Sequence, residues 1–539
     1  MRGRLFLLSF LSGLLLTAAW PSWGFAPVLF VAFVPLLMVQ HTVQLDNRLR
    51  ARHLFVYAYL TFLTWNLLTT WWVKNASMGG AAMAILANAL LMTLVFLVYH
   101  KIRLFLPQRF SAFTFIAIWI AFEFLHLDWD LTWPWLTLGN AFAENYKLIQ
   151  WYEYTGIFGG SAWVLALNIL LFELLTYRHT TLRPVKKKIL YIGSIAALVI
   201  VPITVSLIIF YTIDLDPPGK QKLDIVIVQP NIDPYKEKFN SDFRVQLKKI
   251  LELATSKTDE KTDYVVMPET ALVEDLWENN IKNTVSLHAL RDFVFRFPDL
   301  KIVTGASTYR VYAGNETPSA TARKFTSSPE FYDAYNTALQ IDRDTAHLQI
   351  YHKSKLVPGV EKMPFPRLFK PLEKFAIDLG GSSGSLGVQE ERTVFFSPDK
   401  KAGIAPVICY ESVYGEYVGE YLHNGADFIF IITNDGWWGN SPGYRQHLLY
   451  GRLRAIETRK GIARSANTGI SCFIDVRGEI SQATAWWQPA VIRGTLESLP
   501  GSTFYTRHGD YIGRIALWSS LACLLLAIVR SARIRFKKA

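Results

Sequence analysis

Eight long apolar runs constrain the fold of this 539-residue chain more than any other feature of its sequence. They lie at about residues 5–19, 25–40, 54–73, 82–99, 112–126, 157–176, 189–212 and 511–529. Most approach the roughly 20 residues that cross the hydrocarbon core of a bilayer. Because 51% of the residues are hydrophobic and only 19% are charged, the sequence predicts eight membrane-spanning helices. The shortest run, 112–126, contains Glu123, and a buried or re-entrant helix is the alternative there.

Basic residues gather at the ends of alternate runs. They lie within residues 2–4, 48–52, 101–109, 178–188 and 530–538, whereas the loops 20–24, 74–81 and 127–156 hold only Lys74 and Lys147. Since cytoplasmic loops are enriched in Lys and Arg, we predict that both termini are cytoplasmic. Outside these basic segments Asp and Glu outnumber Lys and Arg, so the formal net charge of +12 does not indicate nucleic-acid binding.

The block between the seventh and eighth runs has the pattern of a compact α/β domain. Short β-branched runs typical of buried strands occur at 222–229, 264–267, 301–305, 337–341, 402–408 and 427–432, and apolar residues have helical spacing at 243–254, 283–295 and 445–459. We therefore expect a membrane domain with seven spans over 1–215, an extracytoplasmic α/β domain over 216–505, and an eighth span with a basic cytoplasmic tail over 506–539. Residues 379–386 are Gly- and Ser-rich and predict a flexible loop.

Three cysteines are too few for a disulfide framework. Cys523 lies in the last apolar run and Cys472 in a strand-like stretch, where packing roles are expected. Cys409 differs because it ends the strand 402–408 and begins a polar turn. A nucleophile in this position is held by a rigid sheet and can still project into a cleft. A buried, unreactive thiol is the alternative.

Glu269 and Lys353 also follow strand-like segments. Pro268 stops one strand and presents the Glu269 carboxylate at its end, and Glu361 comes eight residues after Lys353. A glutamate can accept a thiol proton, and a nearby ammonium can favour the thiolate and stabilise the oxyanion of a tetrahedral intermediate. For either residue alone a surface salt bridge is the usual interpretation, so only the combination with Cys409 indicates an active site.

Metal binding is not expected. His352 and His447 could be bases or metal ligands, but no His, Cys and Asp cluster has the spacing of a zinc site, and a loop or helix-face histidine is the better interpretation.

The ordered motifs resemble those of a known superfamily. Pro268-Glu269-Thr270, Lys353 with Leu356-Val357-Pro358 and Glu361, and Cys409-Tyr410-Glu411 resemble the Glu-Lys-Cys motifs of the nitrilase superfamily. Further segments resemble its membrane-embedded branch, the apolipoprotein N-acyltransferases: Trp133–Leu136, Gly156–Ser161, Gln229–Ile232, Thr433–Gly439, Arg452–Glu457 and Arg464–Gly469. The similarity extends over nearly the whole chain.

The resemblance implies a nitrilase-like αββα sandwich attached to the helices. It implies Glu269 as general base, Lys353 as stabiliser of the oxyanion, and Cys409 as the nucleophile that becomes acylated. It assigns Glu361 and Glu411 as supporting carboxylates of the pocket, and Tyr410 as a pocket residue.

The implied reaction takes an acyl chain from a membrane phospholipid, through a Cys409 thioester, to the N-terminal amine of a diacylated apolipoprotein. No metal or soluble cofactor is required, and a monomer is expected. The implied location is the bacterial inner membrane, with the catalytic domain in the periplasm.

Two loops depart from the common family pattern. Pro358-Gly359-Val360-Glu361 stands where many members have Pro-Phe-Gly-Glu, and Phe239 stands near a common Trp. Trp437 and Trp438 could contact an acyl chain or the bilayer interface, with simple packing as the alternative.

Three other functions are considered. A membrane-anchored amidase or nitrile hydrolase acting on a small molecule is the second hypothesis among enzymes. A transporter is disfavoured because the runs are mostly uninterrupted and their charges lie near the ends. A catalytically inactive scaffold is disfavoured because Glu269, Lys353 and Cys409 are all present.

Overall fold

The computed structural model describes residues 2–22, 24–46, 48–107, 110–177, 185–344, 347–365, 385–398 and 402–536. Its contacts divide the chain into two compact units. Unit 1 contains Met1–Trp71, Ala81–Ile213 and His508–Ala539, and unit 2 contains Trp72–Gly80 and Asp214–Arg507. The basic segments and the expected Gly- and Ser-rich loop are partly outside the described residues, at Arg109, Arg178, Arg183, Lys537, Lys538 and 379–384.

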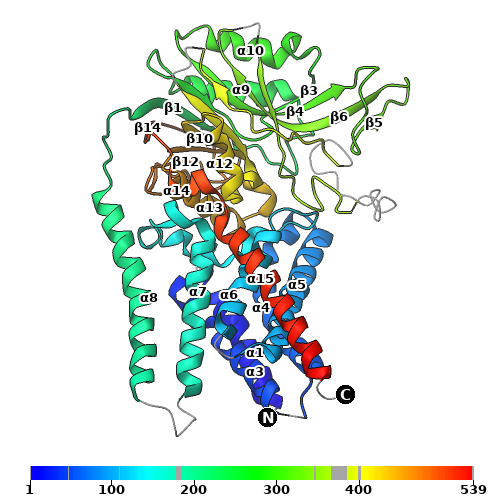
Figure 1. The fold of residues 1–539 in the computed structure, drawn as a ribbon. Coiled ribbons are helices and arrows are strands. Elements are labelled where there is room, and N and C mark those ends of the chain that lie inside the picture. Colours follow the sequence, from blue (N-terminus) through cyan, green and yellow to red (C-terminus); the bar gives the residue numbers. More distant parts are fainter. Residues whose placement is uncertain are drawn as a thin grey trace. The chain divides into compact units, whose positions relative to one another are not determined.

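Unit 1 is helical at each of the eight apolar runs (Figure 1). Its helices are α1 (Arg2–Ala18), α2 (Leu29–Ala32), α3 (Val34–Leu45), α4 (Ala51–Thr70), α5 (Met78–Phe105), α6 (Ser111–Leu125), α7 (Tyr152–Tyr177), α8 (Val185–Thr212) and α15 (Tyr511–Phe536). Five helical segments of the described chain are long and apolar enough to cross a membrane: Ala26–Leu45, Met78–Phe105, Tyr152–Thr176, Lys186–Thr212 and Tyr511–Ile534. α6 is apolar but shorter.

Aromatic side chains form much of the interior of unit 1. Phe33 lies between α2 and α3, and its ring centroid is 5.1 Å from that of Trp119 on α6 and 6.4 Å from that of Phe62 on α4. The helix break at Phe33 leaves backbone groups without helical partners. Asn168 of α7 compensates, because its side-chain oxygen accepts from the Phe33 N–H at 2.8 Å and its amide donates to the Leu29 carbonyl at 2.8 Å.

Unit 2 contains two β-sheets. The larger has the strand order β14-β1-β2-β4-β6-β5, with β3 paired to β4 and β7 paired to β6. Its strands are β1 (Gln221–Gln229), β2 (Tyr264–Val266), β3 (Leu272–Trp277), β4 (Lys301–Val311), β5 (Arg323–Lys324), β6 (Phe331–Ile341), β7 (Gln349–His352) and β14 (Ala490–Ser498). β1, β2 and β4 are parallel to one another.

The smaller sheet has the order β13-β12-β11-β10-β9-β8. Its strands are β8 (Phe395–Phe396), β9 (Gly403–Ile408), β10 (Phe428–Thr433), β11 (Ile462–Ala466), β12 (Cys472–Ile474) and β13 (Ile480–Ser481). β9, β10 and β11 are parallel, and every residue of β9 and β10 is buried. Buried parallel strands of this type account for their continuous apolar sequences.

The sheets pack face to face with helices outside, which gives an αββα sandwich (Figure 1). Between the sheets, the Tyr264 ring of β2 meets the Phe430 ring of β10 at 5.3 Å. α9 (Phe243–Thr255) and α10 (Val285–Val294) share a buried apolar core with the larger sheet, while α12 (Gly415–His423) and α13 (Pro442–Thr458) lie on the smaller one. The strands expected near β1, β2, β4, β6, β9 and β10, and the helices expected near α9, α10 and α13, are confirmed.

Candidate active site

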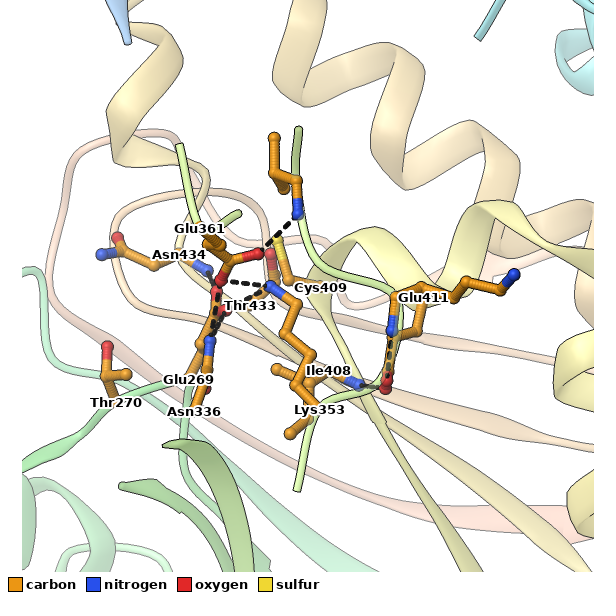
Figure 2. Close-up of polar contacts among 12 residues, drawn as sticks. Glu269, Thr270, Asn336, Lys353, Glu361, Ile408, Cys409, Glu411, Thr433 and Asn434 are labelled. Carbon is orange, nitrogen blue, oxygen red and sulfur yellow. Dashed lines mark hydrogen bonds and ion pairs between the residues drawn. The ribbon is translucent and has the colours of Figure 1, made fainter. Parts of the chain in front are cut away.

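Glu269, Lys353 and Cys409 come together in unit 2. Each follows a strand: Glu269 follows β2, Lys353 follows β7 and Cys409 follows β9. The Lys353 ammonium lies 3.1 Å from a Glu269 carboxylate oxygen, and Figure 2 shows Cys409 beside these two side chains. All three are almost fully buried, with relative exposures of 1% for Lys353, 6% for Glu269 and 7% for Cys409.

Glu361 completes a shared ion pair. Its carboxylate lies 2.8 Å from the Lys353 ammonium, so one cation contacts two carboxylates. The turn after Pro358 makes this approach possible, because Gly359 has φ +78° and its N–H donates to the Lys362 carbonyl at 2.8 Å. The Val357 N–H donates to the second Glu361 oxygen at 2.8 Å. Gly359, in the Pro-Gly-Val-Glu sequence that differs from the common family pattern, therefore forms the turn that brings Glu361 back to Lys353.

Asn336 also links the two carboxylates, through the same oxygen atoms that contact Lys353. Its amide donates to Glu269 at 2.7 Å and to Glu361 at 3.1 Å, and the Asn434 N–H donates to the second Glu269 oxygen at 3.0 Å (Figure 2). Burial alone would raise the pKa of Glu269, but Lys353 and the Asn336 amide outweigh burial and hold this pKa below its ordinary value. Glu269 is therefore ionised at neutral pH and can accept a proton.

Cys409 is a neutral thiol in this environment. Burial and the Glu269 charge raise the pKa of Cys409 well above its ordinary value, although Lys353 and the Thr433 hydroxyl act in the opposite direction. Lys353 was expected to stabilise the thiolate, but in the resting site burial and the Glu269 charge have the larger effect on the pKa of Cys409. Cys409 also has φ +50°, a backbone conformation that is rare for residues other than glycine and often found at functional sites.

Glu411 lies behind the triad and joins two of its strand ends. It is fully buried and accepts from the Ser354 N–H at 2.7 Å and the Ile408 N–H at 2.8 Å, next to Lys353 and Cys409 in sequence. The Tyr351 hydroxyl also donates to it at 2.7 Å. Burial raises the pKa of Glu411, although these donors oppose the shift. Glu411 therefore fixes the backbone on both sides of the site.

A pocket opens over the two carboxylates. It is small and partly open to solvent, and its lining includes Glu269, Glu361, Phe239, Trp437 and Tyr335. Phe239 is 37% exposed, so its ring forms part of the rim. Two of the aromatic residues singled out from the sequence, Phe239 and Trp437, thus lie at the pocket.

The other two aromatic candidates pack against neighbouring aromatic rings, Tyr410 buried and Trp438 half-buried. Tyr410 is 2% exposed and its ring lies 5.3 Å from that of Tyr414. Trp438 lies between Trp72 and His447, with ring centroids 5.2 Å from each.

Residues Trp72–Gly80 belong to this unit, which the sequence did not indicate. The Asn75 amide donates to the Trp438 carbonyl at 2.6 Å, and the Tyr235 hydroxyl lies 2.9 Å from the Asn75 carbonyl and 2.6 Å from that of Trp437. The segment therefore supports the two loops that carry the pocket aromatics.

A buried polar cluster beneath Cys409 was also missed. His447 of α13 lies with Nε2 3.0 Å from the Cys409 carbonyl oxygen and Nδ1 3.0 Å from Asp435. Asp435 in turn pairs with Arg464 at 2.6 Å. Burial opposes ionisation, but Arg464 and His447 hold the pKa of Asp435 well below its ordinary value. The sequence predicted only a loop or helix-face histidine at His447, because its partners lie far apart in the chain.

Two family models match successive parts of the chain. The model of the apolipoprotein N-acyltransferase N-terminal domain matches residues 12–170. The model of the carbon-nitrogen hydrolase family matches residues 225–499, more than half of the chain. The chain belongs to the carbon-nitrogen hydrolase family. Family membership agrees with the resemblance inferred from the Glu269, Lys353 and Cys409 motifs.

Similar members of the family match along nearly their whole length. The apolipoprotein N-acyltransferase of Chlorobaculum tepidum is 29% identical over 531 residues, which cover 97% of each chain. That of Geobacter metallireducens is 25% identical, covering 96% of this chain and 93% of the relative. Among solved structures, Nit3 of Saccharomyces cerevisiae, a member of branch 10 of the nitrilase superfamily, is 16% identical. It covers 51% of this chain and 90% of its own, with a TM-score of 0.36.

Proposed function

We propose that this family member is an N-acyltransferase that moves an acyl chain from a phospholipid to the N-terminal amine of a diacylated apolipoprotein. The observation that carries the proposal is the buried Glu269–Lys353–Cys409 arrangement in a chain whose described residues include five helices long and apolar enough to cross a membrane. A relative named apolipoprotein N-acyltransferase, from Chlorobaculum tepidum, matches 97% of the chain. Both substrates are lipids, so a membrane-embedded enzyme can reach them without moving an acyl chain through water.

In the first step Glu269 accepts the Cys409 proton as the sulfur attacks the ester carbonyl of the phospholipid. The Lys353 ammonium stabilises the oxyanion of the tetrahedral intermediate. Collapse breaks the ester C–O bond, and the departing glycerol oxygen takes the proton from Glu269. The products are a lysophospholipid and a thioester on Cys409.

In the second step the amine of the acceptor attacks the thioester carbonyl. Glu269 takes a proton from the amine, and the intermediate collapses with cleavage of the C–S bond. The Cys409 sulfur recovers its proton from Glu269, and the acceptor leaves with a new amide bond. Glu361 and Asn336 hold Lys353 and Glu269 in place through both steps.

The arrangement in the membrane is part of the proposal. We infer eight spanning helices, α1, α2 with α3, α4, α5, α6, α7, α8 and α15, with both termini in the cytoplasm and the catalytic domain in the periplasm. The distribution of Lys and Arg supports this orientation. The corresponding domains are residues 1–215, 216–505 and 506–539, and the enzyme acts as a monomer.

The decisive experiment is intact-mass analysis of purified protein after incubation with phospholipid. Wild type should gain an acyl mass that hydroxylamine removes and that transfers to an added diacylated lipopeptide. Cys409→Ser is the matched control and should not form a hydroxylamine-sensitive thioester. Hydrolysis of small amides without acylation would support the amidase hypothesis instead, and the absence of both reactions would refute an enzymatic role.

A further inference from the structure

A second buried ammonium lies beside the proposed general base. Lys238, between β1 and α9, is only 3% exposed. Its Nζ donates to the Glu269 carbonyl oxygen at 3.2 Å and to the Thr270 hydroxyl. Both acceptors are uncharged oxygens, so Lys238 contacts the turn that carries Glu269 rather than its carboxylate.

The Lys238 backbone is itself fixed. Its N–H donates to the Asp233 carbonyl at 3.0 Å, and the Gln246 side chain of α9 donates to its carbonyl at 2.9 Å. A long charged side chain that is buried and anchored in this way loses much conformational freedom. The fold therefore holds the ammonium in one place.

The turn that Lys238 contacts is strained. Thr270 has φ +45°, and a left-handed backbone is unusual for a β-branched residue. Such conformations persist only when surrounding contacts hold them. Lys238 provides two contacts on one side of the turn. On the other side, the Gly305 N–H donates to the Pro268 carbonyl at 3.1 Å.

The charge of Lys238 also balances the site. Lys353 is shared by two carboxylates, Glu269 and Glu361, which leaves one negative charge uncompensated within this trio. Glu269 and Cys409 are the groups that favour the charged form of Lys238. Burial is the largest effect and lowers the pKa of Lys238 to about 8, so the ammonium form remains the major one at neutral pH.

We infer that Lys238 is a positioning residue of the active site, holding the Glu269–Thr270 turn and supplying the second positive charge for reaction at Cys409. This inference rests on the proposed function in so far as Cys409 is the nucleophile. A second cation keeps the site neutral both at rest and when the oxyanion forms with Glu269 protonated. Lys238 thus acts through Glu269 and through the potential at Cys409, without contacting substrate.

The test compares Lys238→Met and Lys238→Arg with Lys236→Met in the full-length protein in detergent. Lys236 lies on the same segment with an exposed side chain, so its variant removes the same charge outside the site. Two rates are measured at pH 7: alkylation of Cys409 by iodoacetamide, followed by peptide mass, and acylation by phospholipid.

We expect Lys238→Met to lower both rates about tenfold or more. A neighbouring opposite charge shifts a pKa by roughly 1–3 units, so loss of the Lys238 charge should raise the pKa of Cys409 and leave less thiolate. Lys238→Arg should recover most of each rate, and Lys236→Met should match wild type. Equal rates for the two Met variants would overturn the inference. An Arg variant as slow as Lys238→Met would also overturn it, because charge would then be irrelevant.

A thermal melt controls for folding. If Lys238→Met does not fold, Thr270→Val removes one acceptor of the ammonium and should slow alkylation, whereas a wild-type rate in that variant would overturn the inference. If wild type forms no acyl adduct, the proposed function fails. The alkylation comparison still decides the role of Lys238, because it requires only a reactive Cys409.

Discussion

Asn336→Leu tests whether ionised Glu269 is the general base. Leu has the same number and branching of side-chain heavy atoms as Asn but removes the amide that donates to Glu269 at 2.7 Å and to Glu361 at 3.1 Å. The side-chain oxygen of Asn336 has no hydrogen-bond partner among the described residues, so donation to the carboxylates is what the substitution removes. The backbone carbonyl that accepts from the Lys353 N–H is retained.

The magnitude follows from the charged hydrogen bond. A bond to an ionised group contributes about 1.5–3 kcal/mol. Each pKa unit corresponds to about 1.4 kcal/mol, so losing the bond should raise the pKa of Glu269 by about 1–2 units. Because Glu269 accepts a proton only when ionised, the rate of Cys409 acylation should begin to fall at a pH about 1–2 units higher than in wild type.

The assay is single-turnover acylation by phospholipid, followed by intact mass from pH 4 to 9. Asn283→Leu, at an exposed site, is the matched control and should keep the wild-type profile. Rates at pH 9 should differ less than rates at pH 5, since Glu269 is ionised there in both proteins. An unchanged acid limb with a uniformly reduced rate would refute the argument, because Asn336 would then affect geometry or substrate binding and leave the Glu269 pKa unaltered.

Two further substitutions test other parts of the site. Gly305→Ala places a Cβ 2.4 Å from the Thr270 nitrogen and 2.6 Å from the Glu269 Cα, so we expect acylation to fall at least tenfold. A normal rate would show that this turn tolerates displacement. Asp435→Asn leaves Arg464 buried beside a neutral partner and should destabilise the protein by about 3–5 kcal/mol, measured as a lower thermal midpoint in detergent. The pKa of Asp435 is lower in the folded protein than in the unfolded chain. Its ionised form therefore stabilises the folded protein fully above the unfolded pKa, and this stability is lost as pH falls toward the folded pKa. The difference in thermal midpoint between variant and wild type should thus shrink in acid. A constant difference at all pH values would contradict this interpretation.

The sequence was most informative where a signal is local. Apolar runs predicted the helices of unit 1, and β-branched runs predicted β1, β2, β9 and β10, because burial on both faces requires continuous apolar residues. Cys409 stood out at the end of such a run. The ordered motifs around Glu269, Lys353 and Cys409 led to the family, which comparison then established.

The tertiary structure decided what depends on residues far apart in the chain. Asn336 bridges two carboxylates, His447 reaches the Cys409 carbonyl, and Lys238 holds the Glu269 turn, yet none of these residues has a local signature. The ionisation of the site also depends on folding. Burial and the Glu269 charge keep Cys409 protonated, and Lys353 and Asn336 keep Glu269 ionised against the effect of burial, whereas the residues themselves suggested an ammonium-stabilised thiolate. The sequence determines which side chains are present and in what order. The energies of their ionised forms depend on the distances between charges and on the exclusion of solvent, and both are set only when the two sheets pack.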